Sequence, residues 1–179
     1  MATDDISMKP PVMMSIKPKY CELIAKGEKT IEVRKKRPKI ETPFKCYIYM
    51  TKSNLVGDRK AYKDRLAGKV IGEFVCDCII PISITYSDPN NRIAQKEFPY
   101  TCLKDKEIMD YLGNGNQGYG WHISNLAIYD EPKELSEFKK YNRECWYADL
   151  GLAKRDCPEC QNRECFLTQP PYSWCYVED

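Results

Sequence analysis

Residues 27–34 read Gly-Glu-Lys-Thr-Ile-Glu-Val-Arg, and this stretch decides how the rest of the chain is interpreted. Side chains alternate between the two faces of a β-strand, so Ile31 and Val33 are expected to point to one side. Glu32 and Arg34 then point to the other side, with Lys29 just before them. The pattern allows two interpretations: a half-buried strand whose polar face is solvated, or a row of charges on the floor of a cleft.

A short helix is predicted immediately before this strand. Pro18 suits the first turn of a helix, and Gly27 suits the left-handed position that ends one, which gives a helix over residues 18–26. The apolar run 12–16 before it predicts a first strand. After the motif comes the most basic stretch of the chain, with Lys35, Lys36, Arg37 and Lys39.

The remaining elements follow from periodicity and from breaker residues. Strands are predicted over residues 44–51, 69–80, 123–129 and 173–177, and helices over 105–112 and 132–140. Pro81 is expected to end the longest strand, and Gly72 within it indicates a bulge or a close backbone approach. Residues 114–122 hold three glycines and are expected to form a loop. No regular strand–helix–strand alternation appears, which favours a small mixed barrel over a doubly wound sheet.

Composition limits the class of protein. The chain has 179 residues, of which 30% are charged and 42% hydrophobic, a balance typical of a soluble domain. The net charge of +2 gives no overall attraction to nucleic acid or membrane, so a nucleic-acid site must be a local patch. No apolar run is long enough for a membrane span, and no signal peptide is visible, so a cytoplasmic protein is expected. We expect a flexible arm over residues 1–11, a barrel over 12–140, and a cysteine-rich extension over 141–179 that returns a final strand to the barrel.

Ten cysteines are present in a chain without a recognisable secretion signal. Those inside apolar strand patterns, Cys46, Cys76 and Cys78, are expected to be buried thiols. The C-terminal group offers enough thiolates for a structural, four-coordinate zinc ion, with candidate ligands Cys157, Cys160, Cys165 and Cys175, and Cys145 as an alternate. Free thiols are the alternative, and the rest of the chain requires no cofactor.

The motif Gly27-x-Lys29-x-x-Glu32-x-Arg34, reached through Lys17-Pro18, resembles the signature of the ASCH domain, a branch of the PUA-like superfamily. Residues 68–74, 118–123 and 132–135 resemble the family's central strand and its late loop, strand and helix. Residues 170–177 resemble the tail of phage and Firmicutes ASCH proteins. The resemblance implies an α+β fold, a small mixed PUA-like β-barrel with short helices, and a cleft beside the helix that leads into the motif.

Binding of RNA, or of a modified nucleotide or nucleoside, is the first function that this resemblance implies. Positive side chains at and after the motif could meet phosphates, and two aromatic residues could stack on a base. The candidate binding residues are Lys29, Arg34, Lys35, Lys36, Arg37, Tyr119 and Trp121.

A hydrolase in the same cleft is the second interpretation. One ASCH branch is similar to N4-acetylcytidine amidohydrolases and another to small ribonucleases. In the amidohydrolase branch the resemblance implies a motif lysine, a threonine two residues before the arginine, and a distant glutamate. The lysine corresponds to Lys29, but Glu32 stands in place of the threonine, and Glu73 is the nearest candidate for the distant carboxylate. Lys29 with Glu32 or Glu73 could activate a water, or could form a structural ion pair.

Two further observations bear on function. His122 is the single histidine, so chemistry that needs two histidines is excluded, although a contact between His122 and a ligand is not. A third interpretation is a protein-binding adaptor or regulator that uses the cysteine segment as its contact surface.

Overall fold

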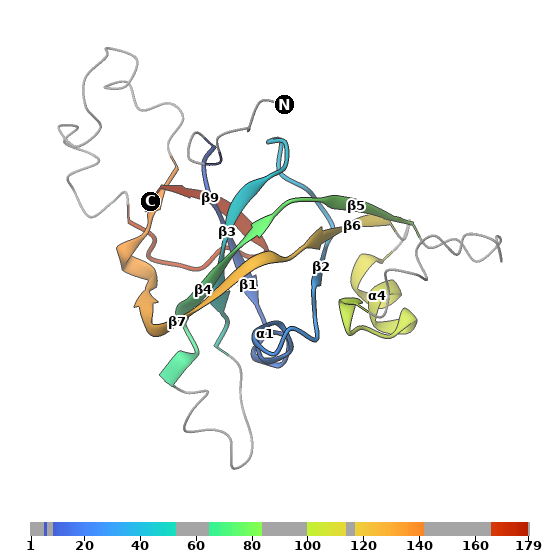
Figure 1. Cartoon of the computed structure of the whole chain (residues 1–179), viewed down its shortest axis with the longest axis horizontal. Coiled ribbons are helices and arrows are strands. Elements are labelled where there is room, and N and C mark those ends of the chain that lie inside the picture. The colour runs from blue at the N-terminus through green and yellow to red at the C-terminus, as the bar shows by residue number, and fades with distance from the viewer. Residues whose placement is uncertain are drawn as a thin grey trace.

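The computed structural model describes residue 6 and residues 9–52, 65–83, 100–113, 117–141 and 166–178. Among these residues, nine strands form a six-stranded sheet in the order β7-β4-β3-β1-β9-β8 and a three-stranded sheet in the order β2-β6-β5 (Figure 1). The strands are β1 (Val12–Ile16), β2 (Ile31–Arg34), β3 (Phe44–Met50), β4 (Lys69–Cys76), β5 (Ile79–Ser83), β6 (Gln117–His122), β7 (Ser124–Glu134), β8 (Lys139–Lys140) and β9 (Trp174–Glu178). The helices are α1 (Pro18–Ala25), α4 (Asp105–Leu112) and the 3-10 turn η2 (Leu135–Glu137). The predicted α+β class is confirmed, and no described helix is long and apolar enough to cross a membrane.

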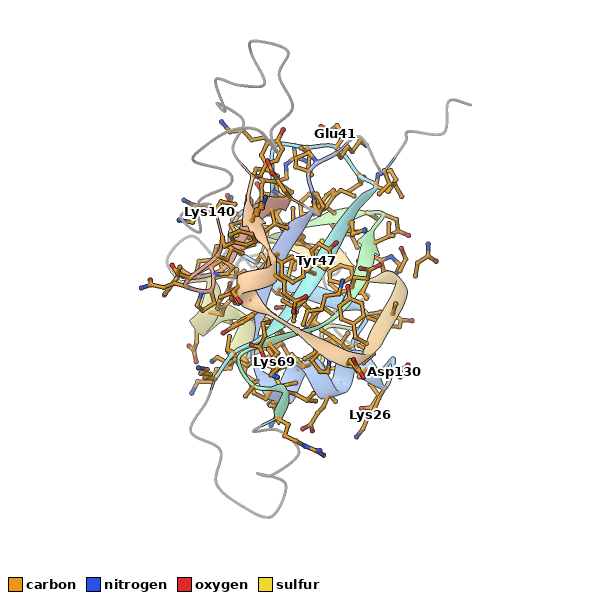
Figure 2. The ribbon with its side chains drawn as sticks, turned by 90° about the vertical axis from the view of Figure 1, so that its left-hand side faces the viewer. Lys26, Glu41, Tyr47, Lys69, Asp130 and Lys140 are labelled. Atoms are coloured by element: carbon orange, nitrogen blue, oxygen red, sulfur yellow. The ribbon has the colours of Figure 1, made fainter. Side chains whose placement is uncertain are left out.

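The middle of the six-stranded sheet is buried on both faces, because β3 carries large apolar or aromatic side chains on both. Phe44, Cys46 and Ile48 pack into the core cluster that also holds α1. Tyr47 faces the other way, and its ring meets that of Phe138 at 4.9 Å between centroids. Figure 2 shows Tyr47 near the middle of this second face. The strand predicted over residues 44–51 is therefore confirmed as β3.

Helix α1 leads directly into β2, as predicted from Pro18 at its start and Gly27 after its end. Gly27 adopts a φ of +72°, and its N–H bonds the carbonyl of Ile24 at 2.9 Å, which closes the helix. Cys21 and Ile24 anchor the helix in the core. Strand β2 then pairs antiparallel with β6, so that Arg34 lies opposite Tyr119.

The long strand predicted over residues 69–80 is two strands, β4 and β5. Pro81 does not end it: β5 continues to Ser83 and pairs with β6 at the edge of the small sheet, where a missing N–H is tolerated. The prediction for Gly72 is confirmed. The pairing with β7 shifts beside it, and a Cβ on Gly72 would overlap the carbonyl oxygen of Ala127.

Two other predictions are wrong for the described residues. Residues 117–122 are not a loop but β6, the middle strand of the small sheet, and their glycines let β2 approach closely. A Cβ on Gly120 would lie 2.9 Å from Cγ2 of Ile31. Residues 132–140 do not form the predicted helix, because Lys133 and Glu134 pair with β4 and extend β7 past Pro132. Only Leu135–Glu137 within this range form a 3-10 turn, η2.

Candidate functional site

The charged side chains of the motif are buried. The exposed fractions of Lys29, Glu32 and Arg34 are 1%, 7% and 6%. The interpretation of β2 as a strand with a solvated polar face is therefore wrong. The structure brings the three charges together, but it encloses them instead of spreading them over an open floor.

Lys29 is held by backbone carbonyls and by a carboxylate. Its Nζ donates to the carbonyls of Ile31 at 2.7 Å and Thr101 at 2.6 Å, and lies 3.2 Å from Oε2 of Glu32. It also lies 5.3 Å from the ring centroid of Tyr20. The ammonium thereby ties β2 to a segment 72 residues further along the chain.

Arg34 completes the cluster on the other side of the carboxylate. Its Nη2 lies 3.1 Å from Oε1 of Glu32 and donates to the carbonyl of Ser15 in β1 at 2.7 Å. Nε of Arg34 is buried and has no hydrogen-bond partner among the described residues, whereas Oε2 of Glu32 is paired with the Lys29 ammonium at 3.2 Å. A buried, unsatisfied N–H group costs about 1–3 kcal/mol, so Arg34 retains unused hydrogen-bonding capacity.

Tyr20 on α1 lies between this cluster and the surface. Burial, followed by the charges of Glu107 and Glu32, raises the pKa of Tyr20. Glu107 on α4 pairs with Lys19 on α1 at 3.7 Å, so the two helices meet above the tyrosine. The motif did not predict this residue; its position on the helical face that leads into β2 was the available signal.

The basic stretch after β2, here called the basic segment, has exposed side chains on a fixed backbone. Its exposed residues are Lys35, Lys36, Arg37 and Lys39. Two aromatic residues of β9 hold its main chain: Nε1 of Trp174 donates to the carbonyl of Lys36 at 3.2 Å, and the N–H of Lys39 donates to the hydroxyl of Tyr176 at 2.8 Å. Four positive charges are thus presented to solvent within five residues.

The aromatic residues predicted to stack on a base are placed differently. Trp121 is fully buried, with ring centroids 5.6 Å from Phe44 and 5.8 Å from Trp174, and it is a core residue. Tyr119 is half-buried and packs against the same core. The Trp121 ring therefore offers no face to a base in this structure, whereas the Tyr119 ring is partly exposed.

Glu73 is not brought to the motif. It accepts a hydrogen bond of 2.5 Å from the hydroxyl of Tyr129, which packs on the opposite face of the large sheet from α1. The structure therefore joins Lys29 to Glu32 but leaves Glu73 apart from them.

His122 forms a separate pair with Asp77. Its Nδ1 lies 2.6 Å from Oδ1 of Asp77, and both side chains are partly exposed. Burial favours the neutral form of Asp77, but the hydrogen bond and charge of His122 outweigh it and lower the pKa of Asp77. In β6 the side chain of His122 alternates with that of Trp121 and so points away from the core.

The predicted burial of the cysteines is confirmed for two of the three residues. Cys46 and Cys76 are buried, and burial raises the pKa of the Cys76 thiol to about 12. Cys78 is exposed, so its predicted burial is wrong, because it lies in the turn between β4 and β5. Of the candidate zinc ligands, Cys175 is half-buried in β9, whereas Cys145, Cys157, Cys160 and Cys165 lie outside the described residues.

Two hollows lie away from the motif charges. One, of about 630 Å³, lies between α1, β4 and β7, and Figure 2 labels Lys69 and Asp130, which line it. The other, of about 910 Å³, is lined by Tyr49, Glu134 and Leu167 among others. Neither is lined by Lys29, Glu32 or Arg34.

Comparisons with known proteins agree with this arrangement. The family model of the ASCH domain matches residues 14–98. The crystal structure of ASCH from Zymomonas mobilis is similar over 95% of this chain and 89% of that chain, with 16% identity and a TM-score of 0.54. Crystal structures of two mutants of the same protein give TM-scores of 0.59 and 0.61 at 15% and 16% identity, each over 96% of this chain and 92% of that one.

The likeness to the Zymomonas mobilis structures concerns the fold alone, and no curated protein matches the sequence. The family match ends at residue 98, so the resemblance of residues 170–177 to phage and Firmicutes proteins stays a prediction. The motif, the fold and the family model agree that residues 14–98 of this chain are similar to an ASCH domain.

Proposed function

We propose that this ASCH domain binds RNA or a nucleotide, and that the basic segment contacts the phosphates. ASCH is a PUA-like fold associated with RNA binding. The observation that carries the proposal is the set of four exposed cations on a backbone held by Trp174 and Tyr176. Because the net charge of the whole chain is only +2, this local concentration of charge is distinctive.

A fixed backbone favours binding because less conformational entropy is lost when the ligand arrives. Lysine and arginine side chains that neutralise phosphates also release counterions, which is the main source of affinity for nucleic acid at low salt. The segment thus supplies attraction without base specificity, which must come from neighbouring groups.

The buried cluster of Lys29, Glu32 and Arg34 holds the strand that leads into the basic segment. Arg34 directly precedes the basic segment, and its contacts with Glu32 and Ser15 fix the end of β2. We propose that Lys29 and Arg34 position the binding surface, and that the unsatisfied Nε of Arg34 is available to a polar ligand group that reaches it.

The hydrolase and adaptor alternatives have less support. A hydrolase would need Lys29 or Glu32 to be free for acid–base chemistry, yet Lys29 is engaged by two carbonyls, and Glu73 lies on another face. The adaptor alternative depends on the cysteine segment, most of which lies outside the described residues. A structural zinc at Cys157, Cys160 and Cys165 stays a proposal.

The salt dependence of RNA binding tests the proposal. We expect the affinity, measured by fluorescence anisotropy, to fall linearly with salt on a double-logarithmic plot. The double variant Lys36→Ala/Arg37→Ala should reduce the slope by about 1.4, since each phosphate contact to a single strand contributes about 0.7.

The control is Lys26→Ala/Lys140→Ala, which removes two exposed lysines elsewhere and should leave the slope unchanged. An equal reduction in both variants would show that the binding is not localised, and absence of RNA binding at micromolar protein would overturn the proposal. Turnover of N4-acetylcytidine that is lost in Lys29→Ala would favour the hydrolase instead.

A further inference from the structure

Two exposed tyrosines accompany the basic segment, each from a different element. Tyr111 on α4 is 37% exposed, and Nζ of Lys35 lies 5.4 Å from its ring centroid. Tyr172 is fully exposed and lies two residues before Trp174, whose indole N–H bonds the carbonyl of Lys36. The segment therefore has one aromatic ring beside Lys35, and a second exposed ring two residues along the chain from the group that holds Lys36.

Tyr172 combines an exposed ring with a fixed main chain. Ser15 Oγ donates to the carbonyl of Pro171 at 2.6 Å, and the Ser15 N–H donates to the carbonyl of Ser173 at 3.0 Å. The carbonyl of the same serine accepts the hydrogen bond from Arg34 at 2.7 Å. The position of Tyr172 is thus coupled to the motif cluster, although its ring stays in solvent.

The aromatic residues beneath this surface make it rigid. Trp174 packs on buried Trp121 at 5.8 Å and on Tyr176 at 5.6 Å between ring centroids, and Tyr176 meets Tyr141 at 6.1 Å. Both Trp174 and Tyr176 also hold the main chain of the basic segment. The cations and the main chain that precedes Trp174, which includes Tyr172, are therefore carried on one connected framework.

We infer that the ligand of this surface is single-stranded RNA, with phosphates on the basic segment and bases stacked on Tyr111 and Tyr172. This inference rests on the proposed function and specifies the form of the nucleic acid. In a duplex the bases are stacked on one another and cannot cover a protein ring, whereas the bases of a single strand can. Positive charge next to exposed rings is the combination that single-strand-binding proteins use, and the charge favours RNA over a neutral protein partner.

The experiment compares a short labelled single-stranded RNA with the blunt duplex of the same sequence, using the full chain. We expect the wild type to bind the single strand more tightly. Tyr111→Ala/Tyr172→Ala should weaken single-strand binding about tenfold or more, because each stacked base contributes about 1–3 kcal/mol, and should leave duplex binding unchanged.

The matched control is Tyr100→Ala, which removes a ring that is 53% exposed. The carbonyl of Tyr100 bonds the N–H of Thr30, so this residue lies at the other end of β2 from the basic segment. The control should bind the single strand as the wild type does. Equal loss in Tyr100→Ala, or duplex binding as tight as single-strand binding, would overturn the inference.

The two proposals fail in different ways. If RNA binding depends on Lys36 and Arg37 but not on the two tyrosines, the basic segment binds phosphates and the stacking inference is wrong. If neither form of RNA binds, both proposals are wrong. Thermal unfolding of each variant shows whether a loss of affinity is a loss of fold, and the single variants Tyr111→Ala and Tyr172→Ala then replace any double variant that fails to fold.

Discussion

Glu32 is the residue on which the motif cluster depends. Its carboxylate lies within 3.2 Å of Lys29 and 3.1 Å of Arg34, and all three side chains are buried. Removing charges from water is expensive, so such a group is stable only when each charge keeps its partner. The net contribution of the ion pairs is therefore smaller than the cost of removing their central member.

The substitution Glu32→Gln tests this dependence. It leaves two buried cations facing a neutral amide, and we expect the free energy of unfolding to fall by about 3–5 kcal/mol in urea denaturation. Glu134→Gln is the control, because Glu134 pairs with Lys69 at 2.8 Å while half-exposed. That variant should lose less than about 1 kcal/mol. Equal losses in the two variants would contradict the buried network.

Thiol reactivity is a second property set at single residues. Burial raises the pKa values of Cys21, Cys46 and Cys76, the last to about 12, so all three remain protonated at pH 8. The thiolate is the reactive form. We therefore expect iodoacetamide at pH 8 to modify exposed Cys78 before these three, as read by mass spectrometry. Labelling in urea is the control, in which the difference should disappear.

At the scale of elements, Gly72 controls how closely β4 and β7 approach. A methyl group there would overlap the carbonyl of Ala127 and lie 3.1 Å from Cα of Ile128, so two backbones would have to separate. We expect Gly72→Ala to lower the free energy of unfolding by about 3 kcal/mol. At Gly27 an added Cβ meets nothing within 4 Å, and only its φ of +72° opposes the change, so Gly27→Ala should cost about 1 kcal/mol. The reverse order would contradict this explanation.

The elements also show which information is local in the sequence. β1, α1 and α4 were predictable almost to the residue, because proline, glycine and periodicity act over a few neighbours. The need for glycine in β6 was not predictable, because a side chain there would collide with Ile31 and Arg34 of the neighbouring strand β2. The strand 132–134 was mistaken for helix because its pairing with β4 is distant in sequence.

The same reasoning applies to the candidate site. The alternation in the motif predicted that Glu32 and Arg34 share a face, and the basic segment was visible as composition. Burial of the cluster was not predictable, because Thr101, which covers Lys29, lies 72 residues away. Trp121 was mistaken for a ligand contact because no local pattern reveals that Phe44 and Trp174 enclose it.

At the scale of the whole molecule, the strands that come first and last in the sequence, β1 and β9, are neighbours in the large sheet and depend on each other for burial. β1 lies between β3 and β9, and β9 carries β8 on its other edge. Val12, Met13 and Met14 in β1 are fully buried opposite Tyr176, Cys175 and Trp174. The C-terminal strand thus completes the core and also anchors the basic segment, so fold and proposed binding surface rely on the same residues.

Removal of residues 172–179 should therefore abolish cooperative unfolding, because β1 becomes an exposed apolar edge and Trp121 loses a packing partner. Circular dichroism melting measures this. Removal of the same number of residues from the other end, 1–8, is the control and should leave the midpoint unchanged, since β1 begins at Val12. A synthetic peptide of residues 171–179 should restore the transition by adding back the strand. If the C-terminally shortened chain melts as cooperatively as the full chain, β9 is an accessory strand, and the coupling between the core and the basic segment is wrong.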